Sequence, residues 1–366
     1  LRAARGMTRR ERLERCYRGQ PVDRPAVYSR TGMPADDPTY DRLRRLLRER
    51  TELKAVWPSA RLDAPYDIDV DLESHSADWD RRVSTLHTPA GDLTATYLVS
   101  RHRLPGLHET FFVDSAEAAE TYLSLPLPDV GDDVSGFFAG DVEVGDAGIA
   151  EAGLGFNPAG FVAELCGSET FAVLSLTHRD LVHALCERQQ RLLLQRLEVL
   201  LDRGVGPFFS ILGQEYVVPP LHGPADFDDF NVRYDAPLID RIHEAGGRIH
   251  VHCHGAVARV FDGFLAMGAD VLHPIEPPPM GDITAAEARR RAGDRICLEG
   301  NLQIHELYES TPEEIRQQVG RLIDDAFTGA GLIVSASASP FIRGAGEDCY
   351  PQYEAMVDTV LARSAA

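Results

Sequence analysis

The sequence lacks the cysteine spacing that would indicate a disulfide framework or a zinc ribbon. Its six cysteines are scattered along 366 residues, and no two of them form a CxxC pair. Disulfide-rich secreted scaffolds and cysteine-based zinc modules both depend on such spacing. We therefore expect free thiols in a reducing compartment. The six positions are Cys16, Cys166, Cys186, Cys253, Cys297 and Cys349.

An excess of basic residues is missing as well. The chain carries 37 Lys and Arg against 57 Asp and Glu, a formal net charge of −20. A field of this sign repels nucleic-acid backbones and anionic membrane surfaces, so neither is an expected partner. The absence of a continuous 18-residue apolar run argues against a membrane-spanning helix. Glu11 and Glu14 interrupt the early arginines and no apolar run follows, so we expect a cytoplasmic protein rather than an exported one.

No GxGxxG fingerprint follows an early strand, which removes the main support for a dinucleotide-binding fold. The second half of the chain instead alternates short β-rich runs with helix-length segments, which is typical of parallel strands joined by helical crossovers. Together with strand candidates in the first half, this alternation favours an α/β fold of the (β/α)8 or TIM barrel type. The expected strands are 24–30, 148–155, 206–212, 248–253, 269–275, 295–300 and 332–337, and the expected helices are 179–203, 227–245, 257–267, 285–291 and 312–327.

Residues 58–112 depart from this alternation. Within them, the segment RVSTLHTPAGDLTATYLVS alternates in strand fashion around PAGD (89–92), which predicts a β-hairpin with its own turn. We interpret residues 58–112 as a small inserted hairpin at the barrel mouth. Because the chain contains no internal repeat, we expect residues 1–366 to form a single barrel domain around this insertion.

The stretch HVHCHG (250–255) carries the strongest chemical signal in the chain. Side chains alternate along a strand, so His250, His252 and His254 share one face while Cys253 lies on the other. The glycine ends the strand and places the last two histidines at its C-terminal end, where the active sites of barrels lie. His250 lies deeper and is expected to be a core or supporting residue.

Two histidines at alternate positions can hold a divalent metal, or they can be hydrogen-bonded groups that line a polar cavity. The next predicted strand runs into HPIEPPPMGD, which places Glu276 at the end of the neighbouring strand. Two imidazoles and a carboxylate then converge, the ligand set of many catalytic zinc sites. We therefore predict a metal site at His252, His254 and Glu276, with zinc as the expected metal and Fe(II) as the alternative.

These motifs resemble those of the uroporphyrinogen decarboxylase superfamily, (β/α)8 barrels that include zinc-dependent, corrinoid-linked methyltransferases. The sequence is similar at greater distance to the catalytic barrel of cobalamin-independent methionine synthase. The resemblance covers nearly the whole chain and is carried by HVHCHG, GADVLHPIEPPPMGD and the GN of LEGNL, in that order. It implies the barrel fold and an enzyme that transfers methyl groups or removes carboxyl groups.

The metal-binding pattern departs from that of the zinc methyltransferases it resembles. Those enzymes carry a His-x-Cys strand and a later cysteine, whereas here His254 stands in the first cysteine position and the later region offers only serines. Glu276 follows His254 by twenty-two positions, a separation similar to that in methionine synthase. Without thiolates the metal is more Lewis acidic and better suited to activating water or polarising a carbonyl or carboxylate group.

The N-terminal segment also differs from that of true uroporphyrinogen decarboxylases, which hold a polycarboxylate porphyrinogen with several arginines. Arg30 is kept, but the second arginine is missing, and Asp36 and Asp37 stand close by. We therefore expect a porphyrinogen to match this chain poorly. Arg30 is predicted to bind an anionic substrate group, with a surface salt bridge as its alternative role.

Three further side chains follow predicted strands and are expected at the barrel mouth. They are Glu215, Tyr216 and Asn301, which we predict to act in catalysis, with Tyr216 and Asn301 also contacting substrate. For Glu215 and Tyr216 the alternative is a capping carboxylate and a packed aromatic ring.

The leading hypothesis is a metal-dependent methyltransferase that moves a methyl group between a small donor or corrinoid and an acceptor activated at the His2Glu site. The second is a decarboxylase (a lyase) or hydrolase of a small carboxylic acid, which would turn over without a methyl donor. The third is a non-catalytic barrel that binds a corrinoid, a porphyrin-like ligand or a partner protein. A small molecule is the expected ligand, a corrinoid protein is the protein partner of the first hypothesis, and the resemblance leaves a homodimer open.

Overall fold

The computed structural model describes residues 6–102 and 104–363. Within them, eight strands pair in parallel in the order β1-β14-β13-β12-β11-β10-β9-β2. Helices separate these strands along the chain and the sheet curls, which confirms the predicted (β/α)8 barrel. The barrel strands are β1 (Ala26–Val27), β2 (Leu53–Trp57), β9 (Gly148–Phe156), β10 (Phe208–Leu212), β11 (Arg248–His252), β12 (Val271–His273), β13 (Cys297–Leu302) and β14 (Leu332–Ala336).

The helices that follow the strands bury one apolar face each against the barrel. In α13, for example, Thr311 caps the first turn by accepting a hydrogen bond from the Glu314 amide, and Ile315, Val319 and Leu322 face the core. The principal helices are α1 (Arg9–Tyr17), α2 (Asp41–Arg50), α3 (Ala116–Leu123), α4 (Ser135–Val144), α5 (Pro158–Cys166), α6 (Ser168–Thr177), α7 (Arg179–Asp202), α9 (Arg233–Glu244), α10 (Phe261–Met267), α11 (Ala285–Ala292), α13 (Pro312–Ala326) and α14 (Gly346–Leu361); α8 (Pro224–Phe227) and α12 (Glu306–Glu309) are single turns.

A buried glutamate joins the first two barrel strands. The Glu52 amide donates to the Val27 carbonyl at 2.9 Å, and the Val27 amide donates to the Glu52 carboxylate at 2.7 Å. Arg12 and Arg24 pair with the same carboxylate at 2.7 and 2.8 Å, and all three side chains are buried. Side-chain contacts of Glu52 therefore complete the barrel wall between β1 and β2.

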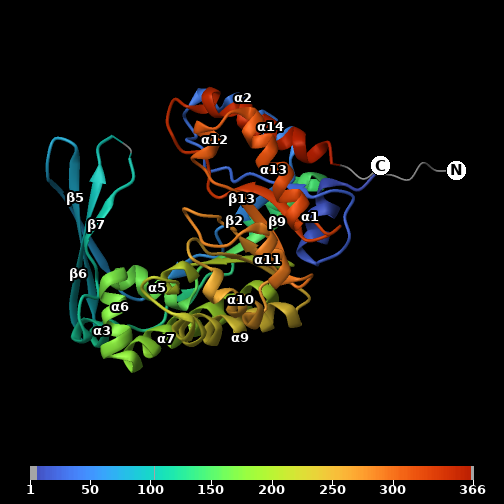
Figure 1. Ribbon diagram of the computed structural model, residues 1–366. Coiled ribbons are helices and arrows are strands. Elements are labelled where there is room, and N and C mark those ends of the chain that lie inside the picture. The colour runs from blue at the N-terminus through green and yellow to red at the C-terminus, as the bar shows by residue number, and fades with distance from the viewer. Residues whose placement is uncertain (1–5, 103, 364–366) are drawn as a thin grey trace.

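The insertion is larger than the predicted hairpin. The hairpin itself is confirmed, because β5 (Trp79–Thr88) and β6 (Gly91–Ser100) pair antiparallel across the predicted turn. β4 (Ile68–Ser74) and β7 (Leu107–Thr110) extend it on both sides into an antiparallel sheet. This sheet stands beside the barrel with α3, α5 and α6 at its base (Figure 1). The short strand β3 (Leu62–Asp63) pairs with β8 (Asp129–Val130) separately.

The six cysteines are buried and unpaired, as their spacing predicted. Within the part of the chain that the structure describes, no single helix is long and apolar enough to cross a membrane. Taken together, the consecutive helices α5 and α6 have the length and apolar composition of a membrane-spanning helix. The chain bends by 112° between them.

Candidate functional site

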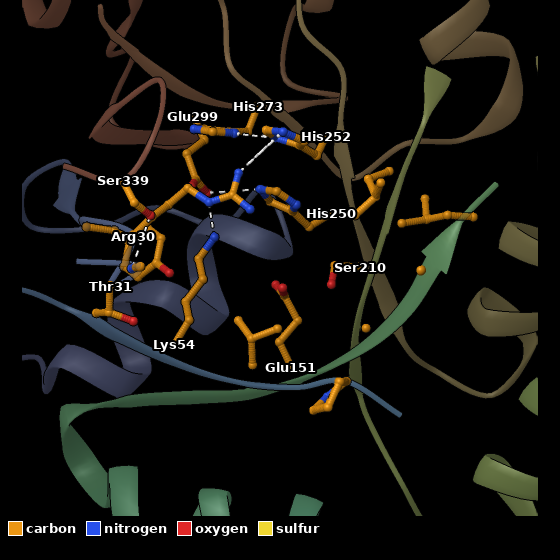
Figure 2. A pocket seen from close by; sticks show the side chains of 18 residues that line it. Arg30, Thr31, Lys54, Glu151, Ser210, His250, His252, His273, Glu299 and Ser339 are labelled. Atoms are coloured by element: carbon orange, nitrogen blue, oxygen red, sulfur yellow. Dashed lines mark hydrogen bonds and ion pairs between the residues drawn. The ribbon is translucent and has the colours of Figure 1, made fainter. Parts of the chain in front are cut away.

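A cavity of about 450 Å³ lies inside the barrel, toward the C-terminal ends of its strands (Figure 2). Its walls come from β2, from β9 to β13 and from the segments that follow β1 and β14. The cavity size is that of a small-molecule site, since such pockets span about 300–1,000 Å³. The ionisable groups that line it are Tyr28, Arg30, Lys54, Glu151, His250, His252, His273 and Glu299.

Three histidine rings stack along one wall of this cavity. His250 and His252 lie on β11, and the parallel register places His252 beside His273 at the end of β12. The His273 ring centroid lies 5.7 Å from that of His250 and 5.0 Å from that of His252. The Nδ1 atoms of His252 and His273 are 2.8 Å apart, and His273 Nε2 lies 3.1 Å from the Ala336 carbonyl oxygen.

These contacts assign the proton positions on both rings. Burial lowers the pKa of His273 far below its usual range, and burial together with His273 and Arg30 does the same for His252, so both rings are neutral. A carbonyl oxygen only accepts, so His273 carries its proton on Nε2 and accepts at Nδ1. His252 then donates from Nδ1 and accepts at Nε2, which lies 3.4 Å from the Arg30 guanidinium.

A buried ion pair occupies the neighbouring part of the cavity. Lys54 Nζ lies 2.6 Å from Glu299 Oε2, with 2% and 1% of the two side chains exposed. Burial opposes ionisation of Glu299, but Lys54 and His250 outweigh it and hold the pKa of this carboxyl well below its usual range. His250 Nε2 lies 3.5 Å from the same oxygen, and neither His250 nitrogen has a hydrogen-bond partner among the described residues.

His250, His273 and Glu299 form a group whose donor atoms lie within 4.8 Å of one another, which is compact enough for a metal ion. Two observations count against a metal there. Lys54 already neutralises Glu299, and both nitrogens of His273 are engaged by His252 and Ala336. We therefore interpret this group as a polar network completed by a lysine.

The predicted ligands His254 and Glu276 lie side by side at the end of β11. His254 Nδ1 is 3.1 Å from Glu276 Oε2, and the Gly255 amide donates to the same oxygen at 3.1 Å. The His252 and His254 rings meet edge to face, with centroids 4.6 Å apart. His252 lines the cavity, whereas His254 and Glu276 lie outside its lining. The three-ligand metal site stays a prediction.

A comparison with protein families places this site in a known group. The family described as uroporphyrinogen decarboxylase (URO-D) matches residues 153–340, a little over half of the chain. The chain belongs to the uroporphyrinogen decarboxylase family. The matched region runs from β9 past β14 and contains the three stacked histidines and Glu299.

Curated relatives of this family match shorter parts of the chain. The uroporphyrinogen decarboxylase of Pseudoalteromonas translucida is 30% identical over 114 residues, which is 30% of each protein. That of Neisseria meningitidis serogroup C is 25% identical over 222 residues, which is 58% of each. The chain thus spans between 30% and 58% of the length of these relatives. A methyltransferase from Methanosarcina mazei superposes with a TM-score of 0.60 over 96% of this chain and 99% of its own, and at 14% identity the likeness shows a shared fold.

Within this uroporphyrinogen decarboxylase barrel, the other predicted site residues are dispersed. Arg30 lines the cavity, and its Nη1 lies 3.1 Å from Nδ1 and 3.4 Å from Nε2 of His252. Burial raises the pKa of Glu215, which accepts from the Gly213 amide, and nearby His254 opposes that shift. The Tyr216 hydroxyl donates to Glu164. Asn301 lines a smaller, separate cavity.

Sequence reasoning missed most of the interior of the cavity. Lys54, Glu151, His273 and Glu299 all lie on barrel strands, and none was chosen as a site residue, although His273 and Glu299 stand in the motifs GADVLHPIEPPPMGD and LEGNL. One signal was available: a polar or charged residue inside an apolar strand run, as in VLH or CLEG, is unusual unless it faces a functional interior. That signal marks His273 and Glu299.

Proposed function

We propose that this chain is a metal-dependent methyltransferase of the uroporphyrinogen decarboxylase family that acts on a small molecule bound in the barrel cavity. One observation carries the proposal. His252 donates from Nδ1 to His273, so its lone pair lies on Nε2 at the strand end, where Arg30 now faces it and where a metal would take the place of that contact. The same ring touches His254, which contacts Glu276. This is the supporting hydrogen bond that orients histidine ligands in metal enzymes.

Two imidazoles and a carboxylate are donor types that zinc takes. His252, His254 and Glu276 would hold it, a His2Glu set that leaves one position for a substrate group. Fe(II) takes the same ligands and is the alternative metal. Bound zinc would supply Lewis acidity that lowers the pKa of the methyl acceptor, so that its conjugate base attacks the methyl group.

The protein's own residues bind and orient the substrate. The Arg30 guanidinium forms no ion pair with a carboxylate of the described residues, so it is free to bind an anionic group beside His252. Glu215 lies close enough to His254 for this ring to lower the pKa of the Glu215 carboxyl, and Glu215 would orient this ligand. The substrate roles of Tyr216 and Asn301 remain predictions, because Tyr216 donates to Glu164 and Asn301 lines the separate cavity. The methyl donor would be a small molecule or a corrinoid protein.

Metal analysis tests the site directly. Inductively coupled plasma mass spectrometry would compare the wild-type protein with a His252→Ala, His254→Ala double variant. The control is His178→Ala, which changes an exposed histidine that is not one of the predicted ligands. We expect about one zinc ion per chain in the wild type and in His178→Ala, and none in the double variant. Absence of bound metal in all three proteins after incubation with zinc or Fe(II) would overturn the proposal.

Decarboxylation of a small carboxylic acid is the second candidate, and the unpaired guanidinium of Arg30 favours it. The two reactions separate cleanly in an assay. Methylcobalamin offered with thiol acceptors reports methyl transfer, and release of labelled carbon dioxide from a carboxyl-labelled acid, without any methyl donor, reports decarboxylation. A porphyrinogen is disfavoured because this cavity offers only Arg30 and the already paired Lys54 to a polycarboxylate.

A further inference from the structure

The charges inside the cavity do not all pair with one another. Lys54 and Glu299 form a tight, buried ion pair that cancels both charges. Two charged side chains remain on the cavity wall, Arg30 on the segment after β1 and Glu151 on β9. In Figure 2 both reach into the cavity, from the side of their respective strands. The cavity therefore presents one cation and one carboxylate that lack an ionic partner in the described chain.

Glu151 is the more deeply buried of the two, with 3% of its surface exposed. Its oxygen Oε2 accepts a hydrogen bond of 2.5 Å from the Tyr17 hydroxyl. Burial, followed by the charges of Glu151 and Glu299, raises the pKa of Tyr17 well above its usual value, so the phenol stays a neutral donor. No lysine, arginine or histidine of the described residues forms an ion pair with Glu151. A buried carboxylate with a single neutral donor is costly to maintain without a cation.

Arg30 is a cation without a carboxylate partner among the described residues. Its guanidinium is half-buried and its hydrogen-bond partner is the neutral ring of His252. Five N–H donors and a fixed planar shape suit this group to a carboxylate. An anion held there would lie beside the strand end that carries the proposed metal ligand.

We propose that the cavity binds a zwitterion, a small molecule whose carboxylate pairs with Arg30 and whose ammonium group pairs with Glu151. Amino acids and betaines belong to this class. Each end of such a ligand satisfies a charge that the fold leaves unpaired, whereas a simple acid or a simple amine satisfies one and leaves the other buried. The Tyr28 ring and the Val56 and Ile211 side chains supply apolar surface in the same cavity.

This inference deepens the proposed function by naming its substrate class, but ligand binding can be measured without metal or turnover. Isothermal titration calorimetry on the full chain, as purified and after chelation, would use two matched series. One compares norvaline with pentanoate and butylamine, and the other compares 5-aminopentanoate with pentanoate and pentylamine. Glycine betaine tests a fully methylated ammonium group.

We expect at least one zwitterion to bind about tenfold or more tightly than both of its singly charged analogues, since one satisfied buried charge contributes a tenfold or larger effect. Equal affinity of a zwitterion and its acid analogue, throughout both series, would overturn the inference. Absence of metal from all three proteins in the earlier experiment would overturn the proposed function and leave the zwitterion result standing. The two failures are therefore distinguishable.

Charge-neutral variants assign each end. Glu151→Gln should abolish the preference for the zwitterion over pentanoate while keeping pentanoate affinity, and Arg30→Gln should weaken pentanoate and zwitterion alike. Glu117→Gln, a matched change on the exposed face of α3, should leave the affinities unchanged. If Glu151→Gln kept the full preference in a folded protein, as judged by circular dichroism, the ammonium site would be refuted.

Discussion

Replacement of Lys54 by methionine should strongly destabilise the fold, because it leaves a carboxylate without its partner inside the barrel. Lys54 and Glu299 are 2% and 1% exposed and 2.6 Å apart. Removal of one partner of such a pair costs about 3–5 kcal/mol, because the remaining charge stays buried and unpaired. The Lys54 ammonium also lies 4.6 Å from the centre of the Tyr28 ring, a contact worth about 0.5–2 kcal/mol. We therefore expect a loss of about 4 kcal/mol in the free energy of unfolding.

The stability loss of Lys54→Met should depend on pH through the pKa of Glu299. In the wild type the pKa of Glu299 is depressed, so its contribution is present above the unfolded pKa and is lost only at strongly acidic pH. In Lys54→Met the main opposing cation is gone, so burial raises the pKa of Glu299. A fall from about pH 7.5 to about pH 5.5 should then protonate Glu299 in the variant. The difference in free energy of unfolding between the wild type and Lys54→Met should therefore become smaller at the lower pH.

Urea unfolding followed by far-ultraviolet circular dichroism measures these free energies. The double variant Lys54→Met, Glu299→Leu removes both charges and should recover most of the loss. Arg316→Met, which breaks an exposed pair with Glu313, should cost less than about 0.5 kcal/mol. If Lys54→Met lowered the free energy of unfolding by less than about 1 kcal/mol, or by the same amount at both pH values, the claim that Glu299 stays buried and unpaired would be refuted.

Three further changes test other parts of the structure. His273→Phe keeps a ring in the stack but removes the acceptor for His252 Nδ1, so zinc affinity in a chelator competition should fall by about 10–100-fold, and unchanged affinity would contradict the proton assignment. Glu52→Ala removes the shared partner of two buried arginines and should cost about 3–5 kcal/mol by chemical denaturation. Burial raises the pKa of Asp235 to about 7, so this group favours folding below about pH 4 and loses that contribution as the pH rises through 7. The stability of Asp235→Asn relative to wild type should therefore increase by up to about 4 kcal/mol across that range.

Seven of the eight barrel strands were predictable because their evidence is local, whereas β2 was not among the expected strands. Strand and helix runs alternate at the right lengths, and β11 was expected within one residue of its observed bounds. The insertion was predicted only as its central hairpin. β4 and β7 were missed because all their residues are exposed, so their sequences show no clear apolar pattern. Only their pairing with the hairpin strands identifies them.

The site was partly predictable for a related reason. Periodicity placed His252 at the strand end where β11 has it, whereas its contact with Arg30 was not predicted. The contact with His273 depends on the register between β11 and β12, which strand pairing sets and a single sequence does not display. Glu151 was not chosen because periodicity alone does not tell which face of a strand points inward.

The junction between β1 and β2 has a consequence for local opening. β1 is two residues long, and its link to β2 consists of the Val27 contacts with Glu52 instead of a continuous ladder. Arg30 follows three residues later and contacts His252 across the cavity. Deuterium exchange at the Val27 amide should therefore be faster than in the central strands, and an anion that binds Arg30 should slow it. Ligand binding and closure of this part of the barrel wall are thus coupled in one segment.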